Sequence, residues 1–77
     1  MNEILIRFVI VKNGRIIEAR LDERLSFRNN LRHLGELAGE DLSQASVYDP
    51  YKKIFLDRNI VLAKFNISRF ITLHLFT

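Results

Sequence analysis

Apolar and polar residues alternate at both ends of the chain. In residues 4–11 the even positions from Ile4 to Ile10 are all apolar, whereas the odd positions include Arg7. A period of two predicts a β-strand, and the even series should face the core because burying an unpaired arginine is costly. Near the other end, Ile71, Leu73 and Leu75 alternate with Thr72, His74 and Phe76. This second alternation predicts a final strand in which Ile71, Leu73 and Leu75 face inward.

Asn13-Gly14 separates the first strand from a second one, which we expect from about residue 15 to residue 21. Both turn residues tolerate positive φ, so Asn-Gly between two apolar runs predicts a tight β-hairpin. The second strand should direct Ile17, Ala19 and Leu21 towards the core.

A helix is predicted next, because Phe27, Leu31, Leu34 and Ala38 follow one another at helical spacing. Ser26 precedes the first of them and is a good N-cap. Gly39 can close the helix in a left-handed conformation. Gly35 inside the helix costs up to about 1 kcal/mol relative to alanine, and the sequence does not say what it allows.

Short elements follow the helix. We expect strands at residues 45–48 and 53–56, joined by a turn at Asp49-Pro50, and another turn at residues 57–59. Leu62, Phe65 and Ile67 are too apolar and too closely spaced to face water together, so they predict a buried turn before the last strand. The predicted core consists of Ile6, Phe8, Ile17, Leu21, Leu31, Leu34, Val47, Leu62, Leu73 and Leu75.

Length and composition indicate one domain over residues 1–77, with 48% hydrophobic and 27% charged residues. The chain has no cysteine, which excludes disulfides and thiolate sites. No stretch is apolar enough to insert into a membrane, and Met1-Asn2-Glu3 lacks the positive start of a signal peptide. We therefore expect a cytoplasmic protein. The net charge of +3 permits binding to nucleic acid, anionic lipid or an acidic protein, but we favour the interpretation that it serves solubility.

The run from Leu62 to Ile67 and the strand Thr72-Leu73-His74-Leu75 resemble the end of ubiquitin. Residues 13–39 are similar to the hairpin turn, second strand, capped helix and closing glycine of that family. The resemblance implies an α+β, β-grasp (ubiquitin-like) fold: a ββαβ(β)β mixed sheet packed on one helix, with the last strand beside the first. The sequence ends Leu75-Phe76-Thr77 without the family's diglycine tail, so we do not expect conjugation through the C-terminus.

A narrower resemblance is to the small bacterial ubiquitin-like proteins that accompany type VII secretion systems. They share the length, the order of elements and a corner such as Leu21-Asp22, and they lack the diglycine tail. They usually carry Gly-Asp before the last strand, where this sequence has Arg69-Phe70. The resemblance implies an accessory role beside a secretion system.

No catalytic or metal-binding constellation is present in the sequence. His33 and His74 are the only histidines, and neither belongs to a set of residues with the spacing of metal ligands. We interpret His33 as a partly exposed surface residue. We therefore expect a protein that is not an enzyme and has no cofactor or metal.

Arginines recur every four residues at Arg24, Arg28 and Arg32, and Arg20 can extend the series. One interpretation is a basic face that docks on nucleic acid or anionic membrane. The alternative, which we favour, is a solvated helix face on which Glu36 neutralises Arg32. Nucleic acid is not the expected partner, because the helix offers no interleaved aromatic residues.

The outer face of the predicted sheet carries Tyr48, His74 and Phe76. By the ubiquitin resemblance, the third strand lies beside the last, which makes these residues one exposed patch at the positions of that family's recognition surface. Aromatic side chains are enriched at protein interfaces. We therefore expect a non-catalytic module that binds a protein partner through this patch, as a monomer or a weak homo-oligomer that uses the same face.

Overall fold

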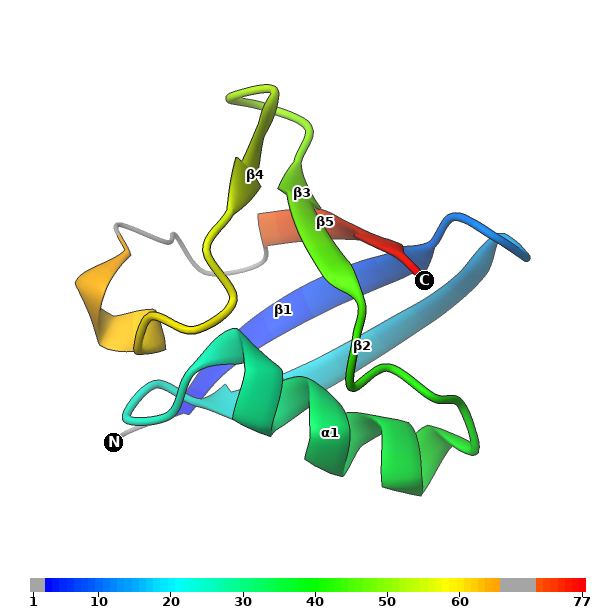
Figure 1. Cartoon of the computed structure of the whole chain (residues 1–77), viewed down its shortest axis with the longest axis horizontal. Coiled ribbons are helices and arrows are strands. Elements are labelled where there is room, and N and C mark those ends of the chain that lie inside the picture. The colour runs from blue at the N-terminus through cyan, green and yellow to red at the C-terminus, as the bar shows by residue number, and fades with distance from the viewer. Residues whose placement is uncertain (1–2, 66–70) are drawn as a thin grey trace.

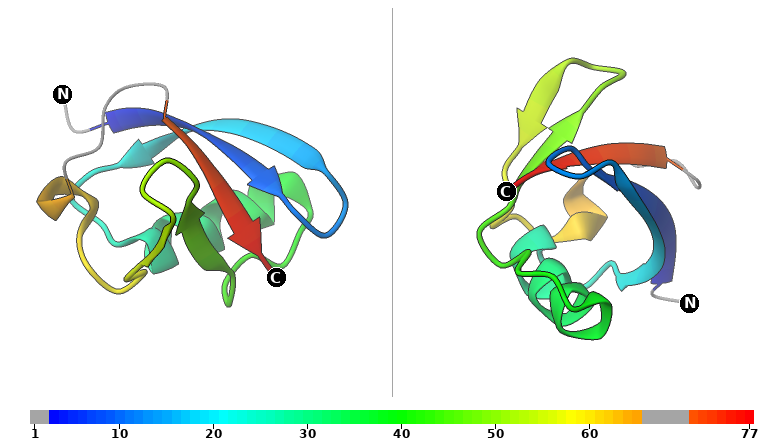
Figure 2. Two further views of the ribbon diagram at one scale, coloured as in Figure 1. Left: turned by 90° about the horizontal axis from the view of Figure 1, so that it is seen from above. Right: turned by 90° about the vertical axis from the view of Figure 1, so that its right-hand side faces the viewer.

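The computed structural model describes residues 3–65 and 71–77. Along the chain the elements are β1 (Glu3–Ile10), β2 (Arg15–Asp22), α1 (Phe27–Ala38), β3 (Ser46–Asp49), β4 (Ile54–Leu56), the 3-10 helix η1 (Leu62–Lys64) and β5 (Ile71–Phe76). The five strands form one sheet in the order β2-β1-β5-β3-β4. The helix lies in the concavity of this curved sheet (Figures 1 and 2).

The predicted pairing of the first and last strands is confirmed. β5 runs parallel to β1, with Phe8 opposite Leu73 and Ile10 opposite Leu75. β2 and β3 pair antiparallel with β1 and β5 respectively. A parallel neighbour needs a long crossover connection, which the intervening helix and the β3–β4 hairpin provide. The sheet is therefore mixed, as predicted.

The helix begins and ends as the sequence indicates, whereas the hairpin loop is longer than a tight Asn-Gly turn: Ile10 pairs with Arg15 across residues 11–14, and Asn13 does not adopt the positive φ that the sequence allowed. Gly14 adopts φ 72° in the first turn. Ser26 caps α1, since its hydroxyl oxygen accepts from the backbone N–H of Asn29 at 3.2 Å, and Gly39 ends it in the left-handed region at φ 70°. Gly35 has a steric role, because a Cβ there would lie 2.5 Å from the carbonyl oxygen of Glu40.

The core lies between the helix and the inner face of the sheet. Nine of the ten predicted core residues are buried, and Phe27, Ile10, Leu42 and Ala45 join them. Ile17 is only half-buried, because it lies on the edge strand β2, where one side of the sheet has no further strand. The predicted bounds also shift: β1 begins and ends one residue earlier, and β3 starts at Ser46.

The predicted buried turn before β5 forms in part. Leu62 is buried in η1, and the Phe65 ring packs 5.6 Å from that of Phe27. Ile67 lies outside the described residues. The backbone of this segment bonds back to the β2–α1 loop, with Leu62 N–H donating to Leu25 O and Ala63 N–H to Glu23 O, both at 2.9 Å.

Candidate functional site

Three strands bring aromatic side chains together on the outer face of the sheet, opposite the helix. Tyr48 of β3 is paired with His74 of β5 on one side and with Phe55 of β4 on the other. Ring centroids lie 6.2 Å apart for Tyr48 and His74, 5.0 Å for Tyr48 and Phe55, and 6.0 Å for Tyr48 and Phe76. Phe55 and Phe76 are themselves 5.8 Å apart. These four residues are called the aromatic patch below.

The aromatic patch has a half-buried centre and an exposed rim. Phe55 is 61% exposed and Phe76 is 42% exposed. Tyr48 and His74 are half-buried instead of fully exposed, because they lie on the interior strands β3 and β5, pack against each other, and Tyr48 is also covered by the rings of Phe55 and Phe76. The structure thus brings together all three predicted patch residues, and it shows that the most exposed ring of the cluster is one that the prediction left out.

The signal for Phe55 was present in the sequence. In residues 54–56 the central side chain must face opposite to its neighbours, and Val47 pairs with Leu56 on the inner face. An inward Leu56 therefore directs Phe55 outward. The sequence predicted this short strand but not its pairing register with β3, which places Phe55 directly beside Tyr48.

The apolar surface continues beyond the aromatic patch along one row of the sheet. Val9 of β1 lies beside His74, and Ile16 of β2 lies beside Val9. Ile16 is 62% exposed. This row crosses every strand of the sheet, from Phe55 at one edge to Ile16 at the other.

Charged groups near the aromatic patch are mostly basic. On β1 and β2, Arg7 and Glu18 neutralise each other across a 3.4 Å ion pair. Lys52 and Lys53 lie in the turn between β3 and β4. No ion pair joins either lysine to a carboxylate among residues 3–65 and 71–77. The turn at the β4 end of the aromatic patch therefore carries two lysines without an ion pair, beside one carboxylate, Asp49, which accepts from the backbone N–H groups of Tyr51 and Lys52.

The predicted basic face is divided by the structure. Arg24 binds the Asp22 carboxylate through two hydrogen bonds, of 2.9 and 3.0 Å, and so lowers the pKa of Asp22 while its own pKa is raised. Arg20 lies on β2, away from the helix. Arg28 and Arg32 alone of the series share a groove, described below, together with Asn29.

Arg32 does not pair with Glu36 as the favoured alternative supposed. Its Nη2 donates to Asn29 Oδ1 at 2.8 Å, and the ion pairs of the described residues do not include it. His33 is exposed on the helix, as expected. Within the described ranges no three His, Asp or Glu residues gather as metal ligands. The described helix is too short and too polar to cross a bilayer.

The order of elements, the mixed sheet and the single packed helix define the ubiquitin-like β-grasp fold, as predicted. A designed protein based on ubiquitin has a TM-score of 0.74 with this chain at 20% sequence identity, over 96% of this chain and 87% of that one. The C-terminal ubiquitin-like domain of mouse tubulin-specific chaperone e has a TM-score of 0.70 at 14% identity, over 97% and 86%. No protein-family model and no curated protein matches the sequence.

Proposed function

We propose that this protein is a non-catalytic interaction module that binds a protein partner through the aromatic patch. The observation that carries the proposal is the cluster itself: Phe55 and Phe76 stay exposed while their rings lie within 6 Å of each other. Contiguous exposed apolar surface is uncommon on monomeric proteins and often marks an interaction site. The ubiquitin-like fold supports the same class of function, since it is that of a small interaction module.

The aromatic patch suits a partner with an apolar anchor flanked by carboxylates. Tyr48 and His74 are half-buried, and the exposed rings of Phe55 and Phe76 pack against Tyr48 and against each other. An aliphatic or aromatic side chain packed on the exposed faces of Phe55 and Phe76 would bury area at little entropic cost to the rigid rings. Carboxylates beside that anchor would meet Lys52 and Lys53, which strengthens encounter and orientation more than affinity.

The test compares two double variants with the wild type in affinity capture from native extract. Phe55→Ala with Phe76→Ala should keep the fold, because both rings are exposed, and should lose the partner. Hot-spot truncations cost about 2 kcal/mol or more each, which is roughly thirtyfold in affinity. Leu25→Ala with Leu37→Ala is the matched control, since these side chains are 42% and 76% exposed and lie outside the aromatic patch and the turn that carries Lys52 and Lys53.

The captured protein is then purified and its affinity measured directly for each variant. Equal binding by wild type and the Phe55→Ala, Phe76→Ala variant would overturn the proposal. A partner lost only on Arg28→Ala with Arg32→Ala would favour the basic face instead. If no second protein is captured, and the wild type self-associates in sedimentation whereas the Phe55→Ala, Phe76→Ala variant does not, the partner is another copy of this chain.

The finer predictions rest on resemblance and composition alone. An accessory role beside a bacterial type VII-like secretion system predicts that the gene lies next to those of secretion ATPases, and its genomic neighbourhood tests this. A cytoplasmic location and the absence of enzymatic activity stay predictions. Fractionation of cells that express the tagged protein tests the location.

A further inference from the structure

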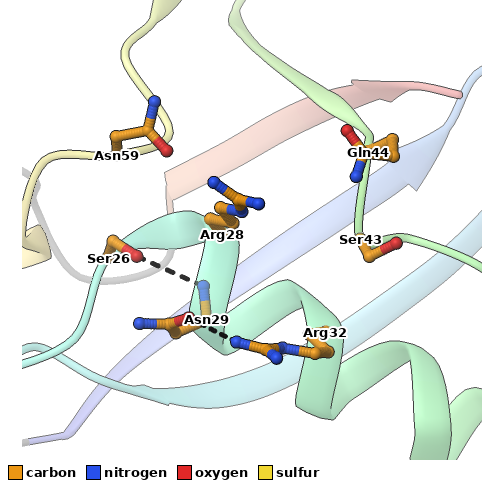
Figure 3. Close-up of a pocket in the computed structure, with 7 residues that line it drawn as sticks. All are labelled: Ser26, Arg28, Asn29, Arg32, Ser43, Gln44 and Asn59. Atoms are coloured by element: carbon orange, nitrogen blue, oxygen red, sulfur yellow. Dashed lines mark hydrogen bonds between the residues drawn. The ribbon is translucent and has the colours of Figure 1, made fainter.

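A polar groove lies on the far side of the helix from β2. Its volume is about 490 Å³, within the range of small-ligand sites. The lining side chains come from the start of α1, the loop before β3 and the turn after β4: Ser26, Arg28, Asn29, Arg32, Ser43, Gln44 and Asn59. Figure 3 shows Arg28 extending between Asn59 and Gln44, with Arg32 one turn further along the helix.

The groove contains two guanidinium groups and no carboxylate among its lining residues. Arg28 and Arg32 are four residues apart on α1, so their Cβ atoms lie about 6 Å apart and both can reach one ligand group. The Arg28 side chain has no hydrogen-bond or ion-pair partner among the residues described. The nearby carboxylates Asp41 and Asp57 accept from Ser43 and from the backbone N–H of Asn59 respectively.

Three of the five neutral side chains of the groove, those of Ser26, Asn29 and Gln44, have a free hydrogen-bond donor. Asn29 Oδ1 accepts from Arg32 at 2.8 Å, and Gln44 Oε1 accepts from Arg58 Nη2 at 3.1 Å. Each amide oxygen is thereby occupied, which leaves the amide NH₂ group free to donate. The Ser26 oxygen accepts from Asn29 N–H at 3.2 Å, so its O–H is also free to donate.

The N-terminus of α1 contributes a positive electrostatic field to the groove, but its backbone N–H groups at Arg28 and Asn30 already have partners. Arg28 N–H donates to Arg58 O at 2.9 Å, and Asn30 N–H donates to Ser26 O at 3.1 Å. No acidic residue lies in the first turn of α1 to offset its positive end. Binding of a ligand here would therefore depend on side-chain donors, with the helix dipole as a secondary contribution.

We propose that this groove binds a phosphate group. Two guanidinium groups, two amide NH₂ groups and one hydroxyl supply more donors than the two oxygens of a carboxylate can use, whereas phosphate has three strongly accepting oxygens. Arginine forms paired hydrogen bonds to phosphate oxygens. The site is independent of the aromatic patch, which lies on the opposite face of the sheet, so either assignment can fail without the other.

The test is a titration of isotope-labelled protein with inorganic phosphate at low ionic strength, followed by NMR. The side-chain NH₂ signals of Asn29 and Gln44 and the Nε–H signals of Arg28 and Arg32 should move together and saturate. Arg28→Gln with Arg32→Gln should weaken binding about tenfold or more, the scale of one lost charge-assisted hydrogen bond. Lys12→Gln with Lys64→Gln removes the same charge at exposed positions outside the groove and should change binding less than twofold.

A second titration with O-phosphoserine identifies the source of the group. Tighter binding than inorganic phosphate assigns the groove to a phosphate ester, and equal or weaker binding assigns it to free phosphate. The proposal is overturned if phosphate gives no saturable shift at these signals, or if both double variants weaken binding equally. It is also overturned if only an oligonucleotide or phosphatidylglycerol vesicles produce a response, because the basic face would then bind a polyanion without a phosphate pocket.

Discussion

Asn30 is the residue whose replacement tests most sharply how the helix is held to the sheet. It is 7% exposed on α1 and faces the edge strand β2. Its Oδ1 accepts from the backbone N–H of Asp22 at 2.9 Å, and its Nδ2 donates to the carbonyl oxygens of Asp22 and Ser26 at 2.9 and 3.0 Å. The side chain thus pairs with Asp22 as a neighbouring strand would.

The cost of Asn30→Ala follows from these three hydrogen bonds. Each contributes about 1 kcal/mol, and part-buried backbone groups that lose their partner cost somewhat more. The better helix propensity of alanine returns about 0.6 kcal/mol. We expect a net loss of about 2–4 kcal/mol, a large fraction of the roughly 4–12 kcal/mol that a domain of this size has.

Urea unfolding followed by circular dichroism measures this loss. Asn29→Ala is the matched control, because it makes the same substitution one residue earlier at an exposed position. The control should lie within about 0.5 kcal/mol of wild type. The amide proton of Asp22 should also exchange faster in Asn30→Ala. Equal stability of Asn30→Ala and Asn29→Ala, at an unchanged dependence of the unfolding free energy on urea, would show that these hydrogen bonds do not hold the helix to the sheet.

Three further predictions concern the core, the helix and one ion pair. Leu73→Ala should cost about 2–5 kcal/mol in urea unfolding, since Leu73 is fully buried, and wild-type stability would contradict its placement. Gly35→Ala should destabilise by about 1–2 kcal/mol despite the better helix propensity of alanine, because its Cβ would meet Glu40 O at 2.5 Å; a more stable variant would refute this. Arg24→Gln should raise the pKa of Asp22 towards its ordinary value in an NMR titration. Because its pKa is lowered in the folded protein, Asp22 stabilises the fold at any pH above the ordinary pKa of aspartate. This stabilisation is lost as the pH falls through the lowered pKa of the folded state. Arg24→Gln should therefore lose less stability than wild type over that acidic range.

Local signals in the sequence were sufficient for most of the fold. Gly14, the Ser26 cap and Gly39 each act through local backbone geometry, so no distant contact was needed to recognise them. Strand alternation identified the inner face because a period of two leaves only two choices. The half-buried Ile17 was missed because alternation gives the face of a strand but not its distance from the sheet edge.

Long-range partners were not accessible from the sequence. Asn30 looked like an ordinary helix residue, and its role depends on Asp22 being brought alongside by the hairpin. The phosphate groove joins residues from three separate segments, and Arg58, which orients Gln44, had no reason to be linked with Arg28 and Arg32. Helical spacing predicted that Arg28 and Arg32 share a face. It could not show that Arg24 forms an ion pair with Asp22 instead of extending that face.

The aromatic patch is the surface through which we propose that this protein binds its partner. Its most direct test is an NMR titration of the labelled protein with the captured and purified partner. We expect the largest chemical-shift changes at Tyr48, Phe55, His74 and Phe76, with little change along α1. Largest changes at Arg28, Arg32 and the groove around them, with the aromatic patch unaffected, would contradict it.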